Sequence, residues 1–287
     1  MTADQELAGK TVNLAQHLPA GFELRQNGNK SIVALPEYID RLAAADISRL
    51  PEAGRGRGAI RRLPMPGGAN LLIRECRRGG VLRFVNKTRH LSPYRALREI
   101  RIGEEAAQRG VPVVRAVAAI IRAGRPFWTC SLVTEEIEET IDLAEYVCWL
   151  PATPPREILK EKRDIIDAVG RAVRKMHDAG LYHADLQAGN ILVRRSTTGV
   201  DVFFVDLDKS FIRPRLPDRL RAHNLRRLNR SIMKMQRALP PMDDDDRRRF
   251  LKAYRSAGPI FGEDVSSLLK SCRRSVVLHS LGWRVFG

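Results

Sequence analysis

Residues 183–190 read HADLQAGN, and one hairpin later the chain reads VDLD at 205–208. Transfer of a phosphoryl group to a hydroxyl needs a carboxylate that takes the hydroxyl proton and a carboxamide that reaches a metal ion on the phosphates. Asp185 and Asn190, five positions apart, have the spacing of these two groups. Asp206 closes an apolar run, as a second metal ligand at a strand end would. The pattern predicts a phosphoryl-transfer centre, and an acidic turn between a helix and two strands is the alternative.

The composition is that of a folded chain. The 287 residues are 44% apolar, which can support a sizeable core in one large domain or two lobes. Four cysteines lie far apart, with no pair spaced for zinc, so a reducing compartment is the simplest expectation. The N-terminus lacks the pattern of a signal peptide, and no apolar run approaches the roughly 20 residues that span a bilayer. We therefore expect neither a secreted nor an integral membrane protein.

The charge balance is strongly basic. Fifty Lys and Arg against 33 Asp and Glu give a formal net charge of +17. Such an excess indicates an anionic partner, which is nucleic acid, an anionic membrane surface or an acidic substrate, and a solvated basic surface is the alternative. Only 6% of residues are aromatic, and no basic segment is interleaved with aromatic residues of the kind that stack bases. This weakens nucleic acid as the partner.

A glycine-rich segment, GRGRG at 54–58, lies ahead of an apolar strand pattern at 71–73. Glycines let backbone N–H groups approach anionic oxygens closely. Gly56 and Gly58 are therefore candidates for a loop over the phosphates of a nucleotide. Any flexible loop would have the same composition, so this signal is weak alone.

Arg74 follows that strand, where a protein kinase has the lysine that contacts phosphates and pairs with a helix glutamate. Arginine keeps the positive charge but differs from lysine in reach and geometry. A helical pattern runs from about residue 93 to Gln108, with Gly110 as its stop signal. Glu99 on this helix is the candidate partner of Arg74, and a solvated helix face is the alternative.

Further elements follow from apolar periodicity and turn residues. Strands are expected at 22–24, 31–35, 113–121, 128–133, 191–193 and 202–205, and helices at 37–45 and at 154–178. A further helix is expected in the arginine-dense segment 213–237, where apolar residues at helical spacing run from 225 to 239. Residues 134–137 would form a hinge, which places a boundary between lobes of residues 1–134 and 135–287. The acids at 243–246 suit the start of a helix and need no metal.

Four stretches resemble the lipopolysaccharide kinases, above all the kinases of 3-deoxy-D-manno-octulosonic acid (Kdo) in the lipopolysaccharide inner core. They are GRG at 56–58, LIRECRRGG at 72–80, Arg98-Glu99 with GVPV at 110–113, and residues 183–208 with NLRRL at 224–228. The resemblance covers roughly residues 50–237. The Arg-Arg-Gly-Gly element and the Asp-x-Asp ending are more specific to this group than the catalytic loop.

The resemblance implies an α+β, protein-kinase-like bilobal fold. The N-terminal lobe would be small, with an antiparallel sheet and one helix, and the C-terminal lobe would be larger and mainly helical. It also implies ATP and Mg²⁺, and action at the cytoplasmic face of the inner membrane. The acceptor would be a lipid-linked anionic sugar, either Kdo or heptose on a lipid A precursor, and the oligomeric state stays open.

By position, Asp185 looks like the catalytic base and Asn190 and Asp206 look like metal ligands. Arg74 and Glu99 look like the phosphate-positioning pair. His183, just before the base, is expected to bond to backbone near Asp206 rather than to act as an acid or base.

The basic surface would then serve the anionic acceptor. Arg77, Arg78, Arg226 and Arg230 are candidates to bind it and to draw the enzyme to an anionic bilayer. The segment 276–286 mixes apolar, aromatic and basic residues, which suits either a membrane interface or packing against the large lobe.

Two other functions fit parts of the pattern. A small-molecule kinase of the aminoglycoside or choline type would bind cationic acceptors with acidic residues, whereas this chain is basic around its motif. A non-catalytic kinase-like scaffold is suggested by Arg74 in place of lysine. Intact Asp185, Asn190 and Asp206 argue against a scaffold.

Overall fold

The computed structural model describes residues 14–53, 60–76, 92–124, 127–151, 153–235 and 242–256. The chain divides into two compact units. Unit 1 comprises Met1–Glu104 with Arg115–Glu136, and unit 2 comprises Glu105–Val114 with Ile137–Gly287. A functional division at residues 134 and 135 stays a prediction.

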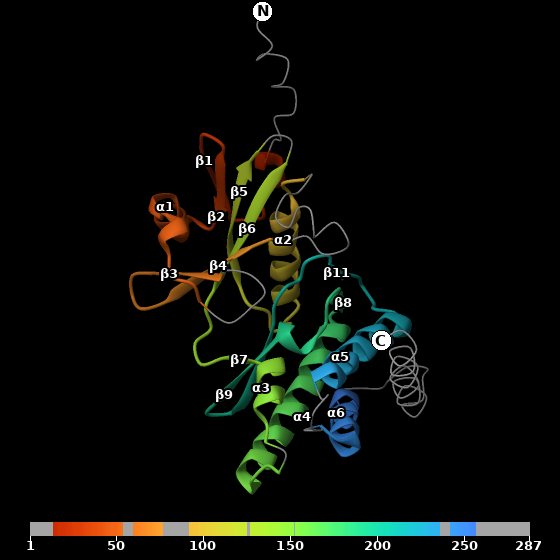
Figure 1. Cartoon of the computed structure of the whole chain (residues 1–287). Helices are drawn as coiled ribbons and strands as arrows, with labels where there is room; N and C mark the ends of the chain where they lie inside the picture. The colour runs from red at the N-terminus through yellow and green to blue at the C-terminus, as the bar shows by residue number, and fades with distance from the viewer. Residues whose placement is uncertain are drawn as a thin grey trace, which may run out of the picture. The chain divides into compact units, whose positions relative to one another are not determined.

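Unit 1 is built on an antiparallel sheet (Figure 1). Its strands are β1 (Glu23–Asn27), β2 (Lys30–Ala34), β3 (Ile60–Pro64), β4 (Asn70–Glu75), β5 (Ala116–Ala123) and β6 (Trp128–Glu135). They are ordered β1-β2-β5-β6-β4-β3, and each neighbouring pair is antiparallel. Short 3₁₀ helices are η1 (Leu14–His17) and η2 (Ile47–Arg49).

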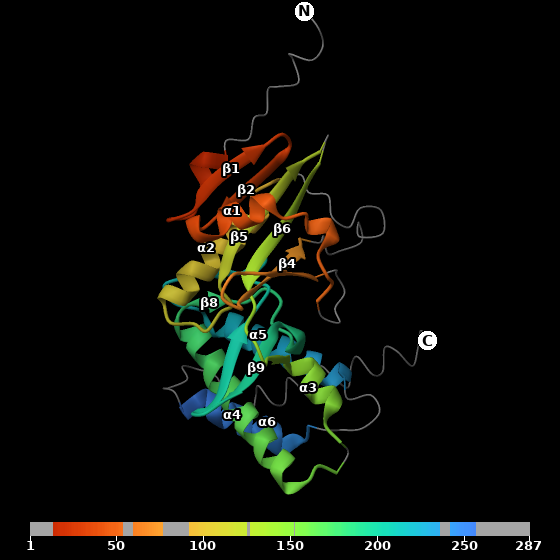
Figure 2. The ribbon, with the colours of Figure 1, turned by 90° about the vertical axis from the view of Figure 1, so that its left-hand side faces the viewer.

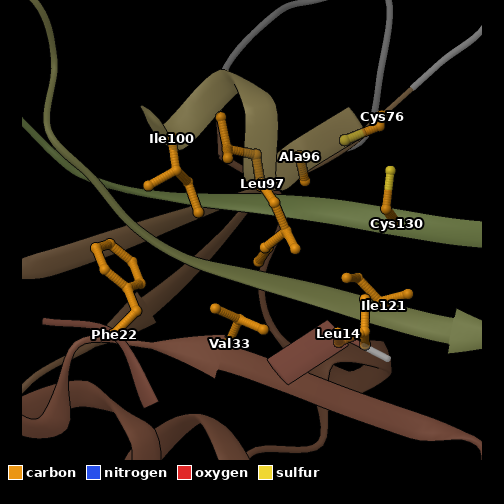
Figure 3. Packing of buried hydrophobic residues seen from close by; sticks show 11 residues of the cluster. Leu14, Phe22, Val33, Cys76, Ala96, Leu97, Ile100, Ile121 and Cys130 are labelled. Carbon is orange, nitrogen blue, oxygen red and sulfur yellow. The ribbon is translucent and has the colours of Figure 1, made fainter. Parts of the chain in front are cut away.

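Two helices cover the two faces of this sheet: α1 (Pro36–Ala44) and α2 (Arg95–Gln108), which runs on into unit 2. Because successive side chains of a strand point to opposite faces, the apolar run of β5 feeds both cores. Ile121 packs in the core with Leu97 and Ile100 of α2, as Figure 3 shows, whereas Ile120 packs in the core with Leu42 of α1. Burying each such side chain contributes about 1.5–3 kcal/mol, which ties both helices to the sheet.

Unit 2 is mainly helical (Figure 2). Its helices are α3 (Leu143–Trp149), α4 (Arg156–Asp178), α5 (Asp218–Met235) and α6 (Asp244–Ser256). Its strands are β7 (Ile141–Asp142), β8 (Leu181–Tyr182), β9 (Ile191–Ser196), β10 (Gly199–Phe204) and β11 (Phe211–Ile212), with the 3₁₀ turn η4 (Ala188–Asn190). They form a sheet of order β10-β9-β7 and the pair β11-β8.

The long helix α4 delivers the chain to the predicted catalytic loop. It buries the apolar stripe that includes Ile165, Val169, Val173 and Met176, and it ends before Gly180. Gly180 has φ +82°, and a Cβ on it would lie 1.8 Å from the carbonyl oxygen of Arg213. A glycine is therefore required where β8 begins its pairing with β11.

Helix α6 packs closely on α4 within unit 2. A Cβ on Gly170 of α4 would lie 2.8 Å from the backbone oxygen of Phe250. A buried ion pair joins the same helices, with Lys162 Nζ 2.8 Å from Asp246 Oδ2. The backbone N–H of Asp246 donates to Asp243 Oδ1, and that of Asp243 donates to Asp246 Oδ2. As the sequence predicts, these acids serve the start of a helix.

Candidate active site

The turn between β8 and β9 holds Asp185 and Asn190. The Nδ2 of Asn190 donates to the backbone oxygen of Asp185 at 2.8 Å. Since the amide nitrogen is engaged inside the loop, Oδ1 is the atom of Asn190 suited to a metal ion. The buried carboxamide thus sets the shape of the loop that presents Asp185.

Asp206 reaches this turn through the pairing of β9 with β10. The register places Phe204 opposite Ile191, and the N–H of Val205 donates to the backbone oxygen of Asn190 at 3.1 Å. Asp206 follows with φ 62°, the left-handed conformation, which costs a residue with a Cβ about 1 kcal/mol or more. The strand register therefore brings the backbone of the second predicted ligand beside that of the first.

His183 is a structural histidine, as predicted. Its Nε2 lies 3.0 Å from the backbone oxygen of Val205, and its Nδ1 lies 3.1 Å from the backbone nitrogen of Asp185. Because a backbone N–H only donates and a carbonyl only accepts, the ring carries its proton on Nε2 and is neutral. Burial lowers the pKa of His183, in agreement with the neutral form.

Helix α5 contacts this loop at three points. Asn224 is fully buried, donates to the backbone oxygen of His183 at 2.7 Å and accepts from its N–H at 3.2 Å. Arg227 forms an ion pair with Asp185, with its Nε 3.0 Å from Asp185 Oδ1. Ser231 Oγ accepts from the N–H of Ala188 at 3.0 Å. None of the three contacts was predicted; only their helical spacing on one face of α5 could have indicated that they act together.

A buried chain of hydrogen bonds continues from Asn224 to α6. His177 Nε2 lies 3.3 Å from Asn224 Oδ1, and His177 Nδ1 lies 2.7 Å from the hydroxyl of Tyr254. Burial and, to a smaller extent, the nearby Arg221 lower the pKa of His177 to about 3. His177 is therefore neutral, and each of its nitrogens has a partner.

The segment after Asp206 also contacts the loop. The N–H of Ala184 donates to Ser210 Oγ at 3.1 Å, and Ser210 is fully buried. The loop is thus held by hydrogen bonds from two elements, α5 and the segment after β10.

The predicted acceptor-binding residues Arg226 and Arg230 lie on α5 beside His223. Partial burial lowers the pKa of His223, and the positive charges of Arg226, Arg227 and Arg230 lower it further. Arg227 of this cluster forms the ion pair with Asp185. Its role toward an acceptor stays a prediction.

The predicted pair of Arg74 and Glu99 is present in unit 1. Arg74 Nη2 donates to Glu99 Oε1 at 2.9 Å, from the end of β4 to α2. Glu99 is 5% exposed, so the pair is largely buried on the carboxylate side. Beside it, the buried cysteines Cys76 and Cys130 lie close together in Figure 3. A hydrogen bond to Cys130 and burial raise the pKa of Cys76.

Several predicted residues lie outside the described residues. Gly56 and Gly58 of the glycine-rich segment are among them, as are Arg77 and Arg78 and the C-terminal segment 276–286. Within the described ranges, no group of three His, Cys, Asp or Glu side chains is placed to hold a metal ion. Among the same residues, no helix is both long and apolar enough to cross a membrane.

Comparison with known proteins identifies the family. The model of the lipopolysaccharide kinase (Kdo/WaaP) family matches residues 48–254. The chain belongs to this family. It is accordingly a kinase, and the resemblance first seen in four stretches of sequence is confirmed over most of the chain.

Relatives and a solved structure agree with the family. A 3-deoxy-D-manno-octulosonic acid kinase of Xanthomonas axonopodis pv. citri (strain 306) is 32% identical over 218 residues, which cover 74% of this chain and 81% of the relative. The kinase of the same name from Haemophilus influenzae (strain PittEE) is 31% identical over 173 residues, covering 58% of this chain and 67% of the relative. The structure titled "WaaP in complex with acyl carrier protein" has a TM-score of 0.58 at 23% identity, covering 85% of this chain and 97% of that one. The likeness confirms the predicted kinase-like α+β fold.

Proposed function

We propose that this kinase transfers the γ-phosphoryl group of ATP to a sugar hydroxyl of the lipopolysaccharide inner core, carried on a lipid A precursor. Family membership and relatives named as Kdo kinases support this reaction and favour Kdo over heptose as the acceptor. The observation that carries the catalytic assignment is the loop itself. Asp185 and Asn190 are joined by a 2.8 Å hydrogen bond, and the backbone of the strand leading to Asp206 bonds to Asn190 at 3.1 Å.

Asp185 is the proposed general base. Its carboxylate would accept the proton of the acceptor hydroxyl as the oxygen attacks the phosphoryl group. Asn190 holds the loop that carries Asp185, and α5 supports the same loop from outside. In phosphoryl transfer the protein mainly aligns the reacting groups, so this rigid support is the main contribution of the chain.

Asn190 and Asp206 are the proposed Mg²⁺ ligands. Their oxygen donors fit a hard divalent cation, and Mg²⁺ in nucleotide sites takes its other ligands from phosphates and water. A site of this kind needs no third protein ligand, which is consistent with the described residues containing no larger acidic cluster. Bound with ATP, the ion would offset negative charge on the phosphate oxygens.

Arg74 and Glu99 are the proposed phosphate-positioning pair. The ion pair at 2.9 Å orients the guanidinium at the end of β4. An arginine here keeps the positive charge that a protein kinase supplies with lysine. We expect this pair to supply the contact that unit 1 makes with the nucleotide phosphates.

The net charge of +17 suits a phosphorylated, carboxylated acceptor in an anionic membrane. We propose that the protein acts as a peripheral protein at the cytoplasmic face of the inner membrane, with Arg226 and Arg230 contributing to acceptor binding. A basic residue near an anionic surface contributes about 1 kcal/mol to attraction. Binding of the protein to anionic but not neutral vesicles would support this placement, and equal binding to both would contradict it.

The test incubates the protein with labelled ATP, Mg²⁺ and either Kdo-bearing lipid A precursor or heptosylated core, and locates the phosphate by mass spectrometry. Asp185→Ala should lower turnover by about 10²–10⁴-fold, because it removes a positioned base. Asp164→Ala, at an exposed position on α4, is the matched control and should keep the wild-type rate. EDTA should abolish transfer and added Mg²⁺ should restore it. Label in neither acceptor would overturn the proposed substrate, and a near-normal rate for Asp185→Ala would overturn the base.

A further inference from the structure

The ion pair between Arg227 and Asp185 engages one oxygen of the predicted base. Arg227 Nε lies 3.0 Å from Asp185 Oδ1, and Arg227 Nη2 contacts the same oxygen. Among the described residues, the other side-chain donor to this carboxylate is Gln187, whose Nε2 lies 3.3 Å from Oδ2. Oδ1 is therefore held by two donors of one guanidinium, whereas Oδ2 has a single long hydrogen bond.

This asymmetry is useful for a general base. The terminal torsion of an aspartate is broad, so a carboxylate on a turn rotates unless something holds it. Two donors on Oδ1 restrict that rotation and leave Oδ2 as the oxygen able to receive a proton. A base must meet the acceptor hydroxyl at hydrogen-bond distance, so a fixed orientation matters more than an added contact.

The charge of Arg227 is also needed at this place. Residues 183–190 contain no lysine and no arginine, and His183 is neutral. A carboxylate close to transferring phosphate oxygens is repelled by their charge unless a cation offsets it. Arg227 brings that cation from a helix 42 positions further along the chain.

The surroundings distinguish this pair from an ordinary surface ion pair. Arg227 and Asp185 are 42% and 39% exposed, and such pairs alone contribute about 0–1 kcal/mol to stability. Here the helix is fixed against the loop on both sides of Arg227, by Asn224 and by Ser231. The backbone that carries the guanidinium is therefore held in register with the backbone that carries the carboxylate.

We propose that Arg227 is a positioning residue for the transfer reaction: it holds Asp185 by Oδ1 so that Oδ2 receives the proton of the acceptor hydroxyl, and it supplies the positive charge that the catalytic loop lacks. The inference rests on the proposed function, in which Asp185 is the base. It gives a role to Arg227, which lies in the NLRRL stretch quoted for the resemblance but is assigned no function by the sequence pattern.

Steady-state kinetics of the full chain test this role. Arg227→Met should lower kcat by about 10²-fold, as for a misplaced reacting group, with KM for ATP and for the acceptor nearly unchanged. Arg227→Lys keeps the charge but has one nitrogen in place of the two that donate to Oδ1, so its kcat should lie between wild type and Arg227→Met. Arg219→Ala, at an exposed position on the same helix, is the matched control and should behave as wild type. Melting temperatures of all variants report whether folding is intact.

A double-mutant cycle separates positioning from other roles. If Arg227 acts through Asp185, then Arg227→Met should cost little more in the Asp185→Asn background. Additive losses would overturn the proposal, as would a raised KM for the acceptor at unchanged kcat, which would make Arg227 an acceptor contact. An Arg227→Lys variant that melts like wild type yet is as slow as Arg227→Met would overturn the role given to the charge of Arg227.

The same double-mutant cycle can be measured a second way, by the rate of ADP release in the absence of any sugar acceptor, when water receives the phosphoryl group. If wild type labels neither sugar acceptor, the proposed substrate fails. The ADP-release cycle still decides Arg227, since loss that is non-additive with Asp185→Asn supports the inference and additive loss overturns it.

Discussion

The buried ring of His177 should make the stability of this kinase depend on pH. In the folded state its pKa is lowered to about 3, against 6.5 for an exposed histidine. As the pH falls from 7 to 5, this ring becomes protonated in the unfolded chain but stays neutral in the folded chain. The free energy of unfolding therefore decreases as the pH falls. At pH 5 the pH is about 1.5 units below the pKa of the histidine in the unfolded chain, which corresponds to a loss of about 2 kcal/mol in the free energy of unfolding. His183 acts in the same direction, because burial lowers its pKa too.

The perturbation that isolates this effect is His177→Gln. The glutamine amide can accept from the Tyr254 hydroxyl and donate to Asn224 Oδ1, as the ring does, but it does not titrate. Stability at pH 7 should therefore change little.

Urea denaturation followed by circular dichroism at pH 7, 6 and 5 measures the difference. The variant should lose about 2 kcal/mol less than wild type between pH 7 and 5. Parallel pH profiles for the two proteins would refute the reasoning, because they would mean that the ring titrates alike in the folded and unfolded states.

Three further substitutions test other contacts. Glu99→Gln should raise KM for ATP by about tenfold in steady-state kinetics, since a charge-assisted hydrogen bond is worth about 1.5–3 kcal/mol; an unchanged KM would contradict the pairing role. Lys162→Met should lower the free energy of unfolding by about 3–5 kcal/mol, because it leaves Asp246 buried without its cation. Adding Asp246→Leu to this variant should recover much of the lost stability. Gly180→Ala should lower the free energy of unfolding by about 2–4 kcal/mol, because of the left-handed backbone and the overlap of the new Cβ with the backbone of Arg213. Gly189→Ala is the control: a Cβ there meets nothing within 4 Å, so this variant should melt close to wild type.

Contacts within one turn or across one strand pair could be predicted from the sequence. Asp185 and Asn190 are five residues apart, so the chain itself keeps them together. The sequence also predicts the hydrogen bond from the His183 ring to the backbone beside Asp206, because both residues lie at the ends of strands that flank the same turn. The ion pair of Arg74 with Glu99 was predicted from a known arrangement of strand and helix, and the structure contains it.

The contacts that depend on how helices dock could not be predicted. The apolar spacing of α5 indicates which face is buried, but its polar positions include many arginines, and nothing local marks Arg227 as the one that reaches Asp185. Asn224 lies in a stretch quoted for the family resemblance, yet its bonds to His183 exist only once α5 packs on β8. Helix α3 was also missed, because a segment of 7 residues carries little periodic signal.

The dependence of the predicted catalytic loop on α5 sets an order of events during synthesis. The whole motif from His183 to Asp208 leaves the ribosome before Arg227, and Tyr254 follows later still. A nascent chain that ends before α5 would carry every signature residue and still lack the helix that shapes them. Kinase activity should therefore emerge only after the helix has been made and has folded against the loop, so unfinished chains hold a complete motif without a working enzyme.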